Sequence, residues 1–215
     1  MVQVFNKTIS SVDVEIVEQP IEIQKKHRVG LIGGTFNPPH IAHLMIADQV
    51  GKQLGLDHVE FIPDYLPPHV DSKDAIEAKH RVEMVRLAIE DNPMFQLNLI
   101  EIERGGKSFT YNTIQELKRR HPETEYYFII GGDMVQYLPK WHKIKELSKM
   151  VNFVGVERPK FEQVSAYPVI WVDAPNLDLS STDIRNNIKH GRSIKYLVPK
   201  KVEEYIKENS LYGYK

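Results

Sequence analysis

From Val29 to the end of the chain, short apolar runs alternate with longer segments whose apolar residues recur at helical spacing. This alternation limits the fold more than any other feature of the sequence. The expected strands are Val29–Ile32, Val59–Ile62, Leu97–Ile102, Tyr126–Ile130, Val151–Val156 and Val169–Val172. The expected helices are Leu44–Leu54, His80–Ile89, Thr113–Arg120, Ser181–His190 and Lys200–Glu208. Strands that alternate with helices pair in parallel through right-handed crossovers. The sequence therefore predicts an α/β fold with a doubly wound parallel sheet and a small helical part at the C-terminus.

The composition narrows the class of protein. The 215 residues are 41% hydrophobic and 27% charged, as in ordinary globular proteins. A formal net charge of −1 gives no reason to expect a nucleic acid or a membrane surface as a partner. The chain has no cysteine and no run near the ~18 apolar residues that span a bilayer. We therefore expect a soluble, cytoplasmic protein.

The first 27 residues differ from the rest of the chain. Val12–Val17 and Ile21–Ile23 alternate apolar and acidic residues, which is typical of an edge strand. Pro20 and the polar run Gln24–His27 fit a linker equally well. We expect residues 1–27 to be an N-terminal extension without an assigned role, and residues 28–215 to form a single domain.

The loop after the first expected strand reads Gly33-Gly-Thr-Phe-Asn-Pro-Pro-His-Ile-Ala-His43. In doubly wound sheets, ligands bind beyond the carboxyl ends of the strands. Paired glycines let the backbone approach a ligand closely, and the start of the next helix attracts phosphate. His40 and His43 are three residues apart, so one helical turn places both imidazoles on the same face, where they can donate to phosphate oxygens.

Other interpretations of this loop are weaker but stay open. The loop has neither the G-x-x-x-x-G-K-[ST] pattern of a Walker loop nor the usual G-x-G-x-x-G dinucleotide fingerprint. Two histidines at this spacing can bind zinc, but no further carboxylate or histidine lies nearby at a suitable spacing. The structural alternative is a tight turn followed by a helix-capping histidine.

A second segment with phosphate-binding potential is Leu179-Ser-Ser-Thr-Asp-Ile-Arg185. Ser180 or Ser181 can cap the expected helix and leave hydroxyl and N–H groups for phosphate. Arg185 lies one turn further on and offers a planar fork of donors. Alone, such a segment is most often an ordinary helix cap. Together with the glycine loop, it predicts a second phosphate clamp.

These two segments resemble the signature motifs of the nucleotidyltransferases related to class I aminoacyl-tRNA synthetases. The first differs from the family's H-x-G-H pattern because Ala42 replaces its glycine, and the second is similar to the I-S-S-T-x-I-R box. The resemblance implies a Rossmann-like sheet. It also implies catalytic roles for His40, His43 and Arg185, and ATP contacts from Gly33, Gly34, Thr35, Phe36, Ser180 and Ser181.

Further segments are similar to the nicotinate-nucleotide branch of this superfamily. They are Glu103–Thr110 followed by Thr113, Gly131–His142, Phe153–Pro159 and Tyr196–Pro199. The resemblance implies that the acceptor nucleotide is bound by Thr110, Asp133, Trp141 and Arg158. Trp141 suits stacking against a cationic pyridinium ring. The structural alternatives are a helix cap for Asp133, a partly buried core position for Trp141 and a solvated surface position for Arg158.

The reaction that the resemblance implies is adenylyl transfer from ATP to nicotinate mononucleotide, with Mg²⁺ carried by the triphosphate. The resemblance runs from Arg28 to about Tyr212. The loop Pro63–His69 is similar to the family's P-x-x-x-P-P-H-K, although Val70 replaces its lysine. Two alternatives are a pantetheine-phosphate or cytidylyl nucleotidyltransferase of the same superfamily, and a non-catalytic nucleotide sensor. The sequence leaves open whether the chain forms a homo-oligomer.

Overall fold

Six parallel strands form one sheet in the computed structural model, which describes residues 26–67, 75–156, 164–175 and 177–214. The strands are β1 (Arg28–Gly34), β2 (His58–Pro63), β3 (Phe95–Leu97), β4 (Glu125–Gly131), β5 (Asn152–Val156) and β6 (Val169–Val172). Their order is β3-β2-β1-β4-β5-β6, and all paired neighbours run parallel. The predicted doubly wound sheet is confirmed. The order reverses between β1 and β4, which marks the edge where such sheets bind ligands.

Five longer helices follow the predicted pattern. They are α1 (Ile41–Gln53), α2 (Ala78–Ile89), α4 (Thr110–Arg120), α7 (Ser181–Lys189) and α8 (Lys200–Glu208). The shorter α3 (Ile100–Arg104), α5 (Gly132–Val135) and α6 (Ile144–Leu147), and the 3₁₀ turns Leu138–Lys140 and Leu211–Gly213, were not predicted. Within the described residues, no helix is long and apolar enough to cross a membrane.

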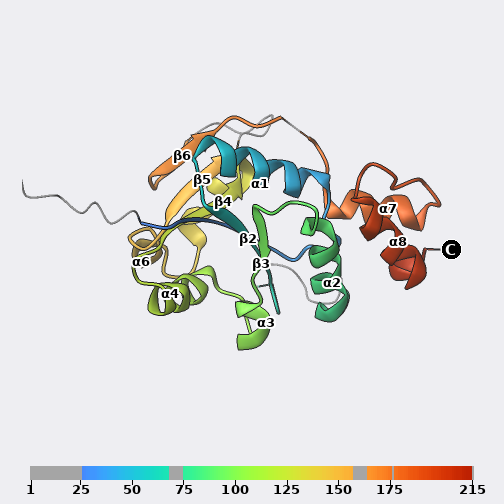
Figure 1. Cartoon of the computed structure of the whole chain (residues 1–215), viewed down its shortest axis with the longest axis horizontal. Helices are drawn as coiled ribbons and strands as arrows, with labels where there is room; N and C mark the ends of the chain where they lie inside the picture. Colours follow the sequence, from blue (N-terminus) through green and yellow to red (C-terminus); the bar gives the residue numbers. More distant parts are fainter. Residues whose placement is uncertain (1–25, 68–74, 157–163, 176, 215) are drawn as a thin grey trace, which may run out of the picture.

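Helices cover both faces of the sheet (Figure 1). Ile32 of β1 packs in a core with side chains of α1 and α2, whereas Leu31 packs in a second core with side chains of α4 and α6. Because both faces are covered, the central strands are nearly continuous apolar runs, and this explains why they could be read from the sequence.

The C-terminal helices form a separate apolar cluster with α2. Met84 of α2 is buried among Ile184 of α7 and Ile206 of α8. In Figure 1, α7 and α8 lie beside α2 at one end of the sheet. The backbone N–H of Ile41, the first residue of α1, donates to the carbonyl of Leu197 at 3.0 Å. The predicted small helical part is therefore attached where the glycine loop enters α1.

The predicted strand Leu97–Ile102 is wrong beyond Leu97. The side-chain oxygen of Asn98 accepts the N–H of Ile100 at 3.0 Å, which turns the chain into α3. A run of apolar residues this short fits a strand and a helix equally well, so the sequence pattern did not distinguish them. The predicted strand or linker before Lys26 lies outside the described residues.

Candidate active site

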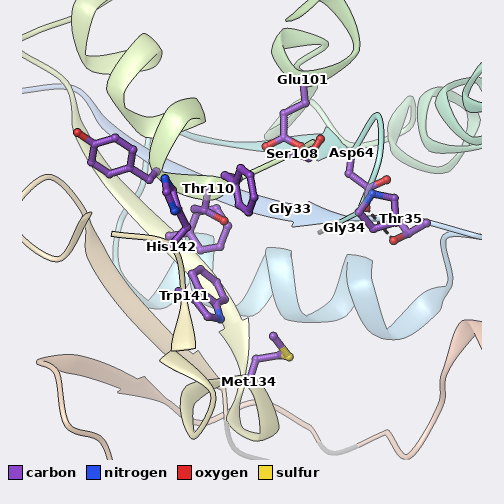
Figure 2. A pocket seen from close by; sticks show the side chains of 14 residues that line it. Gly33, Gly34, Thr35, Asp64, Glu101, Ser108, Thr110, Met134, Trp141 and His142 are labelled. Atoms are coloured by element: carbon purple, nitrogen blue, oxygen red, sulfur yellow. Dashed lines mark hydrogen bonds between the residues drawn. The ribbon is translucent and has the colours of Figure 1, made fainter. Parts of the chain in front are cut away.

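A pocket of about 350 Å³ lies beyond the carboxyl ends of β1 and β2, next to the reversal of strand order (Figure 2). Five residues predicted from the sequence line it, namely Gly33, Gly34, Thr35, Thr110 and Trp141. The other lining residues are Asp64, Pro67, Glu101, Ser108, Phe109, Tyr111, Phe128, Met134 and His142. The pocket therefore joins the glycine loop to the segment predicted to bind the acceptor.

The glycines at the end of β1 make room for aromatic rings of the protein itself. A Cβ atom on Gly33 would lie 3.3 Å from the ring of Phe128, and one on Gly34 would lie 3.4 Å from the ring of Phe36. Phe36 is only 2% exposed and packs against Phe61 in the core. Any contact of Phe36 with ATP would therefore come from its backbone rather than its ring.

The two histidines of the loop are stacked, with ring centroids 3.6 Å apart. His40 precedes α1 and is buried, while His43 lies in the first turn. The backbone N–H of His40 donates to Nδ1 of His43 at 3.1 Å. A neutral His43 that accepts at Nδ1 carries its proton on Nε2. The capping alternative and a phosphate-binding role are therefore compatible, because they use different nitrogens. Within the described residues, no third side chain joins this pair to form a metal site.

The serine–arginine segment contacts the glycine loop directly. The hydroxyl of Ser181 donates to the carbonyl of Pro38 at 2.7 Å, and Arg185 donates to the carbonyl of Asn37 at 2.9 Å. Ser180 caps α7, because its hydroxyl oxygen accepts the N–H of Asp183 at 3.2 Å. The structure thus brings the two predicted phosphate clamps together, with Ser180 serving the helix. Neither Ser181 nor Arg185 lines the pocket described above.

The acceptor side of the pocket includes the start of α4. Thr110 and Tyr111, its first two residues, line the pocket. Their backbone N–H groups have no hydrogen-bond partner in the part of the chain that the structure describes, as is usual for the first turn of a helix. The rings of Phe109 and His142 lie 4.7 Å apart beside them. This wall offers N–H donors together with flat aromatic surfaces.

Trp141 belongs both to the pocket and to the core. Its ring meets Phe128 and Phe153 edge to face, with centroids 5.8 and 6.1 Å away. It also lines the pocket, as Figure 2 shows. One side of the indole therefore packs in the core, as the structural alternative stated. Because the residue also lines the pocket, stacking against a bound ring stays a prediction.

Some predicted site residues lie partly or wholly outside the described parts of the structure. Asp133 lies in α5, directly after β4, but its side chain is not among the described parts. Arg158 and the residues His69 and Val70 also lie outside the described residues. Their roles stay predictions.

Sequence reasoning missed a buried ion pair beside the glycine loop. Arg81 of α2 is 2% exposed and lies 3.0 Å from the carboxylate of Asp64. Arg81 also donates to the carbonyl of Thr35 at 2.9 Å, and the Thr35 hydroxyl donates to Asp64 at 2.8 Å. Burial raises the pKa of Asp64 above its ordinary value, while the bonds from Thr35 and Arg81 oppose that rise. The pair ties together the loops that follow β1 and β2.

A second buried carboxylate, Glu101 of α3, was also missed. It is 7% exposed and lines the pocket, and Thr113 donates to it at 2.5 Å. Burial raises the pKa of this carboxyl group above its ordinary value, and interactions with Thr113 and Ser108 only partly oppose that rise. A glutamate in an apolar run is a weak sequence signal. For Arg81 a usable signal existed, because its helical register places it on the same face of α2 as the buried Met84, Val85 and Ile89.

Comparisons with known proteins give a consistent family. The model of the cytidylyltransferase-like family matches residues 31–187. A protein of Lactiplantibacillus plantarum, described as a probable nicotinate-nucleotide adenylyltransferase, is 55% identical over 206 residues, which cover 96% of this chain and 98% of that protein. An Enterococcus faecalis protein of the same description is 54% identical over 93% of this chain and 91% of its own length.

This chain belongs to the nicotinate-nucleotide adenylyltransferase family. The predicted family and enzyme class, a nucleotidyltransferase, are thereby confirmed. The fold agrees as well: a solved structure titled Plasmodium falciparum nicotinic acid mononucleotide adenylyltransferase complexed with NaAD has a TM-score of 0.74 at 20% identity. The structural match covers 87% of this chain and 98% of the chain in that solved structure.

The similarity to nicotinate-nucleotide adenylyltransferases extends over more of the sequence than the motifs indicated. The alignment with the Lactiplantibacillus relative leaves only about nine residues of the chain unmatched, so it reaches into the segment before Arg28. The motif resemblance, which began at Arg28, therefore underestimated the similarity at this end.

Proposed function

We propose that this chain transfers the adenylyl group of ATP to nicotinate mononucleotide, forming nicotinate adenine dinucleotide and pyrophosphate. An oxygen of the acceptor's 5′-phosphate attacks the α-phosphorus of ATP in line, and the bond to the pyrophosphate oxygen breaks. Such transfers depend mainly on positioning and on neutralising charge, rather than on a protein nucleophile. This role in NAD biosynthesis agrees with the family to which the chain belongs.

On the ATP side, we propose that His40 and His43 bind the α- and β-phosphates. The stacked imidazoles lie at the start of α1, where the helix dipole also favours negative charge. The Nε2–H of His43 is directed away from its capping bond and suits a bridging oxygen that becomes negative as pyrophosphate leaves. Gly33, Gly34 and Thr35 form the adjoining wall.

We propose that Ser181 and Arg185 bind the β- and γ-phosphates. Both already donate to carbonyl groups of the glycine loop, at Pro38 and Asn37, so they lie next to the proposed α/β-phosphate position. A guanidinium has donors left over after one such bond and can also contact phosphate. For Ser180, whose hydroxyl caps α7, the proposed contribution is to hold that helix start in place.

On the acceptor side, we propose that the first turn of α4 recognises the carboxylate of the nicotinate ring. The N–H groups of Thr110 and Tyr111 are the donors, and a carboxylate at a helix start is favoured by the helix dipole. Trp141 supplies a flat surface for the ring. Asp133 would accept from ribose hydroxyl groups, and Arg158 would bind the acceptor phosphate.

Mg²⁺ is proposed to enter as the complex with ATP. This ion prefers phosphate oxygens and water to cages made only of protein ligands. It would offset the charge of the departing pyrophosphate, together with the histidine and arginine donors. We also propose that the enzyme works in the cytoplasm.

The observation that carries this function is the direct contact between the glycine loop and the serine–arginine segment beside a pocket that contains the α4 start. The test is to incubate the purified chain with ATP and Mg²⁺, add nicotinate mononucleotide, nicotinamide mononucleotide or pantetheine phosphate in separate reactions, and measure pyrophosphate. Parallel reactions with CTP in place of ATP test the cytidylyl alternative. Release with nicotinate mononucleotide supports the proposal. Release only with another acceptor, or none at all, contradicts it and favours one of the alternative functions.

Residues 28–215 are proposed to carry the whole activity. Every described residue assigned here to phosphate or acceptor binding lies after Arg28. A chain without residues 1–26 should therefore keep its kcat and both KM values within about twofold. A truncated protein that is folded but inactive would show that the extension has a role in catalysis.

A further inference from the structure

A chain of buried polar groups joins the two sides of the pocket. The backbone N–H of Tyr65, next to Asp64, donates to the hydroxyl oxygen of Ser108 at 3.0 Å. The hydroxyl of Ser108 lies close enough to the carboxylate of Glu101 to lower its pKa. Ser108 and Glu101 are 6% and 7% exposed, respectively. Figure 2 shows both side chains on the same wall of the pocket as Asp64.

Glu101 also holds the first turn of α4. Thr113 donates to its Oε1 at 2.5 Å, and Arg104 donates to the Thr113 hydroxyl at 3.0 Å. Ser108 lies two residues before Thr110, and Thr113 lies three residues after it. The carboxylate therefore holds the first turn of α4 through Thr113 and lies beside Ser108, which precedes the residue at which α4 begins. This helps to fix where the N–H groups of that turn point.

The hydroxyl and the backbone N–H of Ser108 are both engaged by the protein. The hydroxyl oxygen accepts the N–H of Tyr65, and the backbone N–H donates to the carbonyl of Leu66 at 3.0 Å. Ser108 therefore acts on the pocket through the position of the backbone that follows it. The charge of Glu101 is balanced locally by the Thr113 hydroxyl and by Arg104, whose guanidinium lies 3.9 Å from Oε1, whereas Asp64 adds a negative charge nearby.

We propose that Glu101 is a positioning residue for the acceptor nucleotide, because its bond to Thr113 and its place beside Ser108 set the donors at the start of α4. This inference rests on the proposed function of the pocket. It assigns Glu101 to acceptor binding and gives it no part in the transfer of the adenylyl group. It predicts that loss of the carboxylate weakens acceptor binding and leaves ATP binding and the reaction step largely intact.

The test is E101Q, with E103Q as the matched control. Glutamine keeps the size of the side chain, but its amide has one acceptor oxygen in place of two and cannot accept from the Thr113 hydroxyl with carboxylate strength. Glu103 lies in the same helix with its side chain 63% exposed. E101Q should raise the KM for nicotinate mononucleotide about tenfold, equal to about 1.4 kcal/mol. The kcat at saturating acceptor and the KM for ATP should stay within about twofold, and E103Q should match the wild type.

The same measurements separate a positioning role from a merely structural one. A folded E101Q with an unchanged acceptor KM overturns the inference, and so does an equal loss in kcat and in both KM values. S108A should raise the acceptor KM in the same direction. In the double variant, the increase should be smaller than the product of the two single increases, because both side chains act on the same helix start.

S108A alone decides the matter if E101Q does not fold, since an unchanged acceptor KM would then overturn the inference. The two proposals fail in different ways. Absence of turnover by the wild-type chain with nicotinate mononucleotide contradicts the proposed function, whereas normal turnover with an E101Q enzyme like the wild type contradicts only the role of Glu101.

Discussion

Arg185 donates to the backbone carbonyl of Asn37 at 2.9 Å, although 148 residues separate the two in the chain. The bond joins the middle of α7 to the loop that leads into α1. A second contact reinforces it, because the hydroxyl of Tyr212 donates to the side-chain oxygen of Asn37 at 2.8 Å. The C-terminal helical part therefore helps to shape the proposed phosphate site, rather than only covering the sheet.

R185K should impair the handling of ATP. Lysine keeps the charge but not the planar fork, so it cannot bond to the Asn37 carbonyl and to phosphate with the same geometry. We expect kcat/KM for ATP to fall about tenfold or more, with little change in the KM for the acceptor. R192K is the matched control, because Arg192 is exposed just beyond α7. A change in the acceptor KM alone would show that Arg185 serves the other substrate.

H43A should lower kcat by about 10²-fold or more, the scale on which a preorganised donor to developing charge contributes. The substitution also removes the acceptor for the His40 N–H and the stacking between the rings. Thermal unfolding must therefore be measured with turnover, and H121A, at an exposed histidine, controls for the loss of an imidazole. If folded H43A keeps near-normal turnover, the ring serves only as a helix cap.

R81M should lower the free energy of unfolding by about 3–5 kcal/mol, because it leaves the buried carboxylate of Asp64 without its charged partner. It also removes the bonds that Arg81 makes to the carbonyls of Thr35 and Tyr65. R86M is the control in the same helix, since Arg86 is half exposed and its ion pair with Glu83 contributes at most about 1 kcal/mol. Urea unfolding at pH 7 measures both. Equal losses would mean that the buried pair adds nothing beyond a surface pair.

The sheet and the long helices could be predicted because their patterns are local. Buried parallel strands such as β4, in which Tyr126–Ile130 are all buried, are short apolar runs, and α8 has an apolar stripe at helical spacing. The end of β3 was missed because the deciding interaction is one side-chain bond, from the Ile100 N–H to Asn98. A pattern of residue types does not record such a bond.

The residues of the site likewise fall into those that could be predicted from the sequence and those that could not. The glycine loop and Arg185 were found because family motifs mark them, whereas the buried bonds of Arg81 and Glu101 depend on partners far along the chain. Arg81 contacts Thr35, which lies 46 residues away, and Ser108 is bonded to Tyr65 across 43 residues. Whether a charged side chain is buried is decided by such tertiary contacts. Only the position of Arg81 on the buried face of α2 could have indicated it beforehand.

The unmodified enzyme should prefer nicotinate mononucleotide to nicotinamide mononucleotide at least tenfold in kcat/KM. The two differ only in a carboxylate or a neutral amide on a cationic ring. At the start of α4, the N–H groups of Thr110 and Tyr111 can both donate to a carboxylate, and such charge-assisted bonds are roughly twice as strong as neutral ones. The amide would instead turn its NH₂ towards one of these donors, and an unmatched buried group costs about 1–3 kcal/mol. A penalty of about 1.4 kcal/mol, in the lower part of this range, gives tenfold. W141A should weaken both acceptors equally, because stacking does not distinguish the ring substituents, and W141F should restore most of the binding. Equal kcat/KM for the two nucleotides would contradict recognition of the carboxylate by α4.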